Sequence, residues 1–197
     1  MSKAEQTRQL IIKKAALIFN IKGYHGTSIS DILETTGLTK GSIYGNFSNK
    51  NELALAAFDY NSARVLERLD KRMKSATSSK EALLSYPNYY MQNWHSVLKT
   101  GGCPLINAAV EADDNLLFMR ESVRERIRFL INIIKEAIVR GQAISEFNQS
   151  AKPSKYATLI FSLIEGSILI AKIMNDKFYL QIATEKIKQI VEQELEQ

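Results

Sequence analysis

Apolar residues recur at helical spacing along most of the chain. Near the start, Ile11, Ala15, Ile18 and Phe19 follow the i, i+4, i+7, i+8 spacing of one buried helix face. This pattern predicts an amphipathic helix at about residues 5–22. No segment of the sequence alternates apolar and polar residues as a half-buried strand would, so we expect an all-α fold.

Capping signals mark two short helices after the first one. Ser28 followed by Asp31 has the form of a capping box, and the helix that it begins would end at Gly37. Thr39 is suited to cap a further short helix that reaches about Asn46. A longer helix followed by two short ones with a glycine-containing turn between them forms a helix-turn-helix arrangement.

The rest of the chain has the pattern of longer helices. Asn49 with Glu52 predicts the start of a helix that runs to about Lys74, where basic residues suit a helix C-terminus. Pro87 is expected to kink the helix that contains it. We expect further helices at about residues 81–99, 104–113, 116–140, 153–175 and 179–196.

Composition limits the class of protein. Of the 197 residues, 45% are hydrophobic and 24% are charged, as in ordinary soluble proteins. Cys103 is the single cysteine, and neither it nor the two histidines has a zinc-binding or catalytic spacing, so we expect no disulfide, metal or other cofactor. The longest apolar stretch, residues 157–171, is interrupted by polar side chains. We therefore expect no membrane span and a cytoplasmic protein.

The positive charge of the chain lies near its start. Residues 1–50 hold seven basic and three acidic side chains, which gives them +4 of the total net charge of +5. A basic module on an almost neutral remainder is typical of a protein that binds a polyanion such as DNA. We predict a helix-turn-helix DNA-binding domain at residues 1–50 and a larger helical domain at residues 51–197.

The second short helix, within LTKGSIYGNF, carries polar side chains suited to DNA. Ile43 and Phe47 lie four residues apart and can both face the core. Lys40, Ser42 and Tyr44 then point elsewhere, and their side chains can reach base edges and phosphate oxygens. The alternative is an irregular loop in which Tyr44 only covers apolar surface.

Gly41 lies within the same short helix. Glycine costs a helix about 1 kcal/mol relative to alanine, so its presence there needs a compensating gain. Close approach of the backbone to a phosphate or to a groove wall would supply one.

Residues 8–56 resemble the DNA-binding domain of the TetR family of bacterial transcriptional regulators. The resemblance is carried by the stretch GYHGTSISDILETTGLTKGSIYGNFSNKNEL, and the length and all-helical layout also agree with the family. The positions at the characteristic spacing are Gly23, Ser28, Ile29, Ile32, Gly37, Gly41, Tyr44, Phe47, Lys50 and Leu53.

The resemblance implies roles for the matching polar residues. Ser28 would cap its helix and touch a phosphate, while Lys40 and Ser42 would reach into the major groove. Tyr44 and Lys50 would hold the DNA backbone.

Thr39 and Asn46 complete the predicted DNA contacts. Asn46 and Gly45 depart from the family pattern, because many members carry histidine or an aromatic residue there. Asn46 can still donate to a phosphate, but an aromatic contribution is lost.

By the same resemblance, residues 51–197 form a variable helical domain for ligand binding and dimerisation. Ser162, Gly166 and Ser167 would let a partner helix approach the last two predicted helices closely, so we predict a homodimer with a four-helix interface there. The alternative is that these helices pack only within one chain. Their apolar positions are Ala157, Ile160, Phe161, Ile164, Ile168, Ile173, Ile182, Ile187, Ile190 and Val191.

Two groups of residues suggest a ligand pocket. Tyr86, Tyr90 and Trp94 lie on roughly one helix face, where aromatic rings with polar tips either line a pocket or fill a core. Some TetR-family members begin the helix beside their ligand cavity with Gly-Cys-Pro, as GGCPLINAAVEADD does here. The predicted pocket residues are Tyr86, Tyr90, Trp94, Cys103, Asn107, Glu111, Phe161 and Glu165.

Cys103 has two interpretations. Close to a helix N-terminus its thiol pKa would be lowered, and the thiolate could react with electrophiles. A buried and inert cysteine is the alternative.

We therefore expect a homodimeric transcriptional regulator, a repressor, that binds a palindromic DNA operator and is released by an unidentified small-molecule effector. One alternative is a protein that packages DNA without sequence preference. Another is an enzyme that uses Cys103, Glu111 or Glu165, but no recognisable motif places a base beside the thiol, so we do not expect an enzyme.

Overall fold

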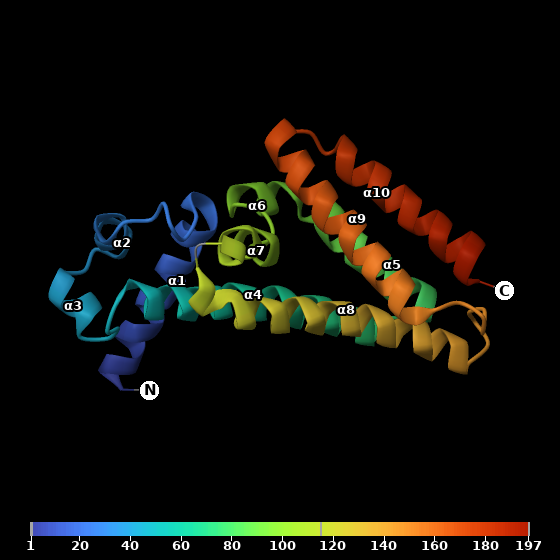
Figure 1. Cartoon of the computed structure of the whole chain (residues 1–197), viewed down its shortest axis with the longest axis horizontal. Helices are drawn as coiled ribbons and strands as arrows, with labels where there is room; N and C mark the ends of the chain where they lie inside the picture. Colours follow the sequence, from blue (N-terminus) through green and yellow to red (C-terminus); the bar gives the residue numbers. More distant parts are fainter. Residues whose placement is uncertain (1, 115, 197) are drawn as a thin grey trace. The chain divides into compact units, whose positions relative to one another are not determined.

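The structure is a computed structural model that describes residues 2–114 and 116–196, and Figure 1 shows its helices in chain order. Those residues contain no strand beyond one bridge between Phe147 and Glu196, which confirms the all-α prediction. The helices are α1 (Lys3–Lys22), α2 (Ile29–Thr36), α3 (Lys40–Tyr44), α4 (Lys50–Ser75), α5 (Ser79–Gln92), α6 (Trp94–Lys99), α7 (Pro104–Asp114), α8 (Arg120–Ala143), α9 (Pro153–Met174) and α10 (Phe178–Gln189), with a 3-10 turn at Leu117–Met119 and a π-helical segment at Ile190–Leu195.

The chain divides into two compact units that are each built from separate segments. The first unit consists of Met1–Arg64 with Thr100–Glu125, and the second consists of Val65–Lys99 with Arg126–Gln197. The first unit therefore holds α7 beside the helix-turn-helix segment, although α7 lies far along the chain. The functional division at residue 50 stays a prediction.

The predicted helix starts in the first unit are confirmed. The Ser28 hydroxyl accepts a hydrogen bond from the Asp31 amide, and the Asp31 carboxylate accepts one from the Ser28 amide, which completes a capping box. Thr39 caps α3 by accepting from the Ser42 amide at 3.2 Å. Gly37 ends α2 in the left-handed region at φ 71°, a conformation that favours glycine.

Apolar side chains from α1, α2, α3 and α4 form the core of the first unit. Phe19 and Ile32 are 0% exposed, and Phe19 stacks on the ring of Tyr24 at 5.1 Å between centroids. Ile43 and Phe47 are also buried, as the four-residue spacing predicted. Each such side chain contributes about 1.5–3 kcal/mol through burial, which holds the two short helices against α1.

The predicted single helix at residues 81–99 is wrong, because it is two helices, α5 and α6. The break falls at Asn93, whose side-chain amide and backbone N–H both donate to the Tyr89 carbonyl, at 2.8 Å and 3.1 Å, and so close the last turn of α5. Pro87 lies inside α5 and does not end it.

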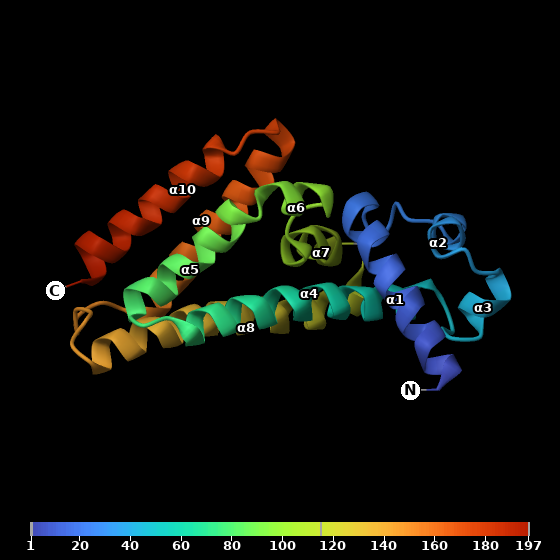
Figure 2. The ribbon, with the colours of Figure 1, turned by 180° about the vertical axis from the view of Figure 1, so that it is seen from behind.

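In the second unit, α9 and α10 run side by side in opposite directions (Figures 1 and 2), and α10 also packs against α5. Most of the apolar residues that we assigned to a partner surface are buried within this one chain. The buried positions are Ala157, Ile160, Phe161, Ile164, Ile168, Ile187, Ile190 and Val191. Only Ile173 and Ile182 of that set are exposed, at 74% and 53%.

Helix α9 is long and apolar enough to cross a membrane by length and composition alone. The core helix of a soluble protein has the same properties, and 44% of the most apolar stretch of α9 is buried inside the fold. These properties are therefore weak support for a membrane span.

Candidate nucleic-acid interface and ligand-binding region

Helix α3 presents a polar outer face. Lys40 is exposed and its ammonium lies 5.9 Å from the centroid of the Tyr44 ring, which is itself 42% exposed. Because Ile43 is buried on the opposite side, the helix is held by its inner face and leaves a lysine and a phenol outward. Both side chains can donate to phosphate or base oxygens.

The fold has room for a side chain at the position of Gly41. A Cβ built there would have the Thr39 hydroxyl as its nearest neighbour, at 3.8 Å, which is ordinary van der Waals contact. The packing of the described residues therefore does not require glycine at this exposed position of α3. The role of Gly41 in close approach of the backbone to DNA stays a prediction.

Three predicted DNA contacts also stabilise helix ends. Ser28 and Thr39 are exposed N-caps, and each hydroxyl also donates its own proton, Ser28 to the Asp31 carboxylate at 2.7 Å and Thr39 to the Ser42 hydroxyl at 3.3 Å. Because a phosphate only accepts, a contact with DNA would use that proton in place of these hydrogen bonds. The Asn46 side chain donates to the Ser42 carbonyl at 2.8 Å, so it satisfies the last turn of α3. Ser42 is half-buried, and its hydroxyl oxygen accepts from the Thr39 hydroxyl at 3.3 Å.

Lys50 differs from Lys40 in its surroundings. Its ammonium donates to the His25 carbonyl at 3.3 Å, and its partial burial lowers the pKa of the amine, an effect that the Glu111 and Asp31 carboxylates partly oppose. The charge of Lys50 is thus partly used to hold the turn between α1 and α2.

Asp31 forms an ion pair with Lys22 as well as its capping hydrogen bonds. The Lys22 ammonium lies 2.6 Å from the Asp31 carboxylate. The hydrogen bond from Lys22, followed by those from Ser28, holds the pKa of Asp31 well below its usual range. The start of α2 therefore depends on an ionised carboxylate.

Arg8 is a residue of this interface region that sequence reasoning missed. Its guanidinium lies 4.1 Å from the centroid of the Phe47 ring and donates to the Asn46 carbonyl and to Glu52. The arginine thus fixes the turn between α3 and α4 against α1. Its partners lie 38 and 44 residues away, so no local spacing could have revealed them.

Glu111 holds the turn that follows α1. One carboxylate oxygen accepts from the Tyr24 amide at 2.8 Å, and the other accepts from the His25 amide at 2.7 Å. The sequence predicts Glu111 in a ligand pocket, whereas in the structure both of its oxygens bind backbone of the helix-turn-helix segment. The reason is that α7 packs on α1 within the first unit.

Asn107 makes the second contact between α7 and α1. Its amide donates to the Asn20 side-chain oxygen at 3.0 Å and to the Gly101 carbonyl at 2.7 Å. Asn20 in turn donates to the Thr100 carbonyl at 2.5 Å and to the Gly102 carbonyl at 3.2 Å. Asn107 thus has a structural role, and its place in a ligand pocket stays a prediction.

Gly101 is required by this network. It has φ 91°, and a Cβ built on it would lie 2.4 Å from the Asn20 carbonyl oxygen. Cys103 follows two residues later and is 2% exposed. Its backbone carbonyl accepts from the backbone N–H of Asn107 at 3.1 Å, as in the first turn of a helix. Cys103 is thus buried directly before α7.

The remaining predicted pocket residues all belong to the second unit, and three of them, Tyr86, Tyr90 and Glu165, are in contact. The Tyr86 hydroxyl donates to the Glu165 carboxylate at 2.8 Å. The rings of Tyr86 and Tyr90 pack edge to face, with 5.8 Å between their centroids. Trp94 and Phe161 are 6% and 7% exposed, and the other three are more deeply buried. A buried carboxylate is costly unless it is hydrogen-bonded, so this pairing stabilises the interior of the second unit.

An apolar strip remains exposed on α9 and α10. Of the three small positions that we predicted to admit a partner helix, Ser162 and Gly166 are exposed. Ser167 is buried and donates to the Ile164 carbonyl at 2.8 Å, so its predicted place on the partner surface is wrong. The strip residues are Leu159, Leu169, Ile170, Ile173, Met174, Phe178 and Ile182. Exposed apolar surface of this kind is often found where a soluble protein contacts a partner.

In residues 2–114 and 116–196, no group of three or more His, Cys, Asp or Glu side chains is placed to hold a metal ion.

Two parts of the chain match the two domains of a known protein family. Residues 11–57 match "Bacterial regulatory proteins, tetR family", and residues 79–187 match "Tetracyclin repressor-like, C-terminal domain". The matched relatives are described as regulators of transcription, and such proteins are not enzymes.

Similar solved structures cover the chain from end to end. A TetR-family regulator from Cytophaga hutchinsonii has a TM-score of 0.94 and 38% identity, with 100% of this chain and 98% of that chain covered. A TetR regulator from Chloroflexus aurantiacus has a TM-score of 0.91 and 32% identity, with 100% and 99% covered. The HTH-type transcriptional repressor NemR of Escherichia coli is 24% identical over 94% of each chain.

Proposed function

Because the chain belongs to the TetR family of bacterial transcriptional regulators, we propose that it represses transcription by binding a palindromic operator as a homodimer and that a small-molecule effector releases it. The observation that supports this most directly is α3. Its inner face is buried while Lys40 and Tyr44 project from a basic segment. Repression is proposed because a relative, NemR, is named a repressor.

The DNA contacts divide by chemistry. Lys40 and Ser42 would donate to base edges in the major groove, and Gly41 would let the backbone of α3 approach closely. Contacts to phosphate position the protein without reading sequence. We assign that positioning to Ser28, Thr39, Tyr44, Asn46 and Lys50.

The exposed strip on α9 and α10 is the proposed dimer surface. The strip contains Ile173 at 74% exposure and Phe178 at 54%, which would be unfavourable in water unless covered. Ser162 and Gly166 would allow the two copies of α9 to approach closely. Two helices from each copy would then form a four-helix interface.

The effector would act in the second unit, near the buried pair of Tyr86 and Glu165. A ligand that displaced this hydrogen bond would change how α5 packs on α9. Such a ligand can shift DNA binding only if its affinity differs between the DNA-binding and the released states. We place this regulation in the cytoplasm.

A fluorescence-anisotropy titration of the protein against DNA flanking its own gene tests the proposal. Competitor DNA of scrambled sequence and a series of salt concentrations separate specific from non-specific binding. Tight binding that survives the competitor would support a local operator. If the competitor abolishes binding at that site, a genome-wide selection of bound fragments decides between a distant operator and no operator.

Lys40→Ala tests the assignment of bases, with Lys71→Ala as a matched control. Lys71 is an exposed lysine of the second unit, so its loss removes the same charge outside the proposed interface. We expect Lys40→Ala to cost about 1–3 kcal/mol on the operator and to reduce discrimination between sequences. Equal weakening on operator and scrambled DNA would show that Lys40 does not read bases.

DNA packaging without sequence preference is the second candidate, favoured only by the basic charge of residues 1–50. Base-pair changes in a candidate operator separate the two functions. Specific binding loses about 1–3 kcal/mol for each mismatch, whereas packaging would be insensitive to them.

A further inference from the structure

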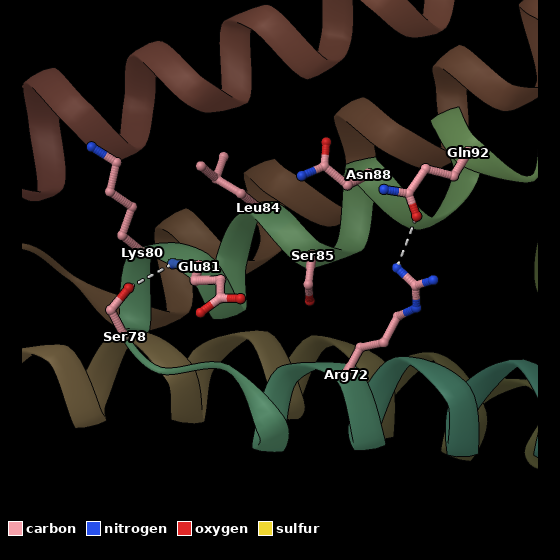
Figure 3. Close-up of a pocket in the computed structure, with 8 residues that line it drawn as sticks. All are labelled: Arg72, Ser78, Lys80, Glu81, Leu84, Ser85, Asn88 and Gln92. Carbon is pink, nitrogen blue, oxygen red and sulfur yellow. Dashed lines mark hydrogen bonds between the residues drawn. The ribbon is translucent and has the colours of Figure 1, made fainter.

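The outward face of α5 borders a hollow of 420 Å³ in the second unit (Figure 3). This volume falls within the range of about 300–1,000 Å³ that is typical of small-molecule sites. Tyr86 and Tyr90 are buried on α5 and do not line the hollow, so it is separate from the effector region proposed above. The lining residues are Arg72, Ser78, Lys80, Glu81, Leu84, Ser85, Asn88 and Gln92.

Arg72 is a fixed cation at one side of this hollow. Figure 3 shows it reaching from α4 to Gln92 on α5, where its guanidinium donates to the side-chain oxygen at 3.2 Å. The guanidinium also lies 5.5 Å from the centroid of the Tyr89 ring. Both partners are neutral, and Arg72 forms no ion pair with any described residue. These two contacts hold the guanidinium of Arg72 in place without neutralising its positive charge.

The other charged groups around the hollow already have partners. The Lys80 ammonium forms ion pairs with Glu192 at 3.2 Å and with Glu196 at 3.0 Å. One oxygen of Glu81 accepts from both the amide and the hydroxyl of Thr77, each at 2.7 Å. Arg72 is therefore the charge in the hollow that can attract a ligand.

The first turn of α5 offers no further amide donors from Ser79, Lys80 or Glu81. The Ser79 and Lys80 amides donate to the Glu146 carboxylate at 2.8 Å each, and the Glu81 amide donates to the Ser78 hydroxyl at 3.0 Å. A ligand in the hollow would have to be held by side chains rather than by the end of the helix.

Neutral hydrogen-bonding groups continue along the same face of α5. Ser85 donates to the Ala82 carbonyl at 2.7 Å and keeps its acceptor lone pairs, and Asn88 is exposed with an amide that can donate or accept. Leu84 adds an apolar surface. The Glu81 carboxylate at the far side disfavours a ligand that carries a second anionic group there.

We propose that this hollow binds a small molecule with one carboxylate or phosphate group and several hydroxyl groups. The guanidinium of Arg72 binds the oxyanion, because its remaining N–H donors suit paired hydrogen bonds to such a group. Ser85 and Asn88 bind the hydroxyl groups. A bound molecule joins α4 to α5, and its binding needs neither DNA nor a dimer, so it can be tested independently of the proposed repressor function.

Isothermal titration calorimetry of the full chain without DNA, at low ionic strength, tests the site. The probes are gluconate, which carries a carboxylate, glycerol 3-phosphate, which carries a phosphate, and sorbitol as a neutral counterpart. We expect saturable one-site binding of at least one anion and none of sorbitol. The anion that binds more tightly identifies the preferred oxyanion.

Two arginine variants show whether binding occurs in the hollow. Arg72→Gln should weaken binding about tenfold or more, because the charge-assisted hydrogen bonds are lost. Arg64→Gln is the control, because Arg64 lies on the same helix and its guanidinium also packs over a tyrosine ring, at 5.2 Å from the Tyr60 centroid. Arg64 does not line the hollow. It should leave the affinity within about twofold.

A third variant adds charge without altering Arg72. Ser85→Glu places a carboxylate in the hollow and should weaken anion binding as strongly as Arg72→Gln, with an unchanged circular-dichroism spectrum. The proposal is overturned if neither anion binds saturably up to about 10 mM. It is equally overturned if Arg72→Gln and Arg64→Gln weaken binding by the same factor, or if Ser85→Glu has no effect.

Discussion

Replacing Glu111 by glutamine should destabilise the protein by about 1–2 kcal/mol. The carboxylate accepts two backbone hydrogen bonds, from Tyr24 at 2.8 Å and from His25 at 2.7 Å, whereas a glutamine keeps one acceptor and turns its NH₂ group toward the other donor. A hydrogen bond to a charged group contributes about 1.5–3 kcal/mol, and water can partly replace it here because His25 is exposed. The midpoint of thermal unfolding should fall by about 2–8 °C.

Urea unfolding followed by circular dichroism measures this loss. Asp113→Asn is the control, because it removes the same charge from an exposed side chain on α7. If Glu111→Gln and Asp113→Asn give the same free energy of unfolding, the Glu111 hydrogen bonds do not hold the turn after α1.

Three further changes test other parts of the structure. Because the pKa of Asp31 is lowered in the fold, its stabilisation is present above the unfolded pKa of about 4 and is lost as the pH falls through the folded pKa. Asp31→Asn should thus lower the urea midpoint at pH 7, with the difference from wild type shrinking in acid; a constant difference would contradict this. Gly41→Ala should raise stability by up to about 1 kcal/mol while weakening operator binding, and anisotropy that shows unchanged affinity would remove the role of close approach. Tyr86→Phe should cost about 2–3 kcal/mol in urea unfolding, because Glu165 loses a buried donor; a change under about 0.5 kcal/mol would refute that value.

Local signals predicted the helix-turn-helix region well. The capping roles of Ser28 and Thr39 and the burial of Ile43 and Phe47 depend on spacings of three or four residues. Such spacings determine which side chains share a turn, so the sequence alone was sufficient. The wrong prediction of a single helix at residues 81–99 also has a local cause. The side chain of Asn93 bonds to the carbonyl of Tyr89, four residues earlier in the same helix.

Contacts between distant segments could not be predicted in this way. Glu111 binds backbone 86 and 87 residues away, and Arg8 reaches a partner 44 residues away. A helical wheel shows that Asn107 and Glu111 share a face but not whether that face meets a ligand or another helix. The apolar faces of α9 posed the same problem, because periodicity does not distinguish an intrachain core from a partner surface.

The network at the start of α7 has a consequence for how this sequence can change over generations. Asn20, Gly101 and Asn107 satisfy one another through hydrogen bonds that cross some 80 residues of chain, and Gly101 has no room for a side chain. A single replacement at any of the three leaves a donor, an acceptor or a clash that the other two cannot resolve. We therefore expect related proteins either to keep all three residues or to replace more than one of them.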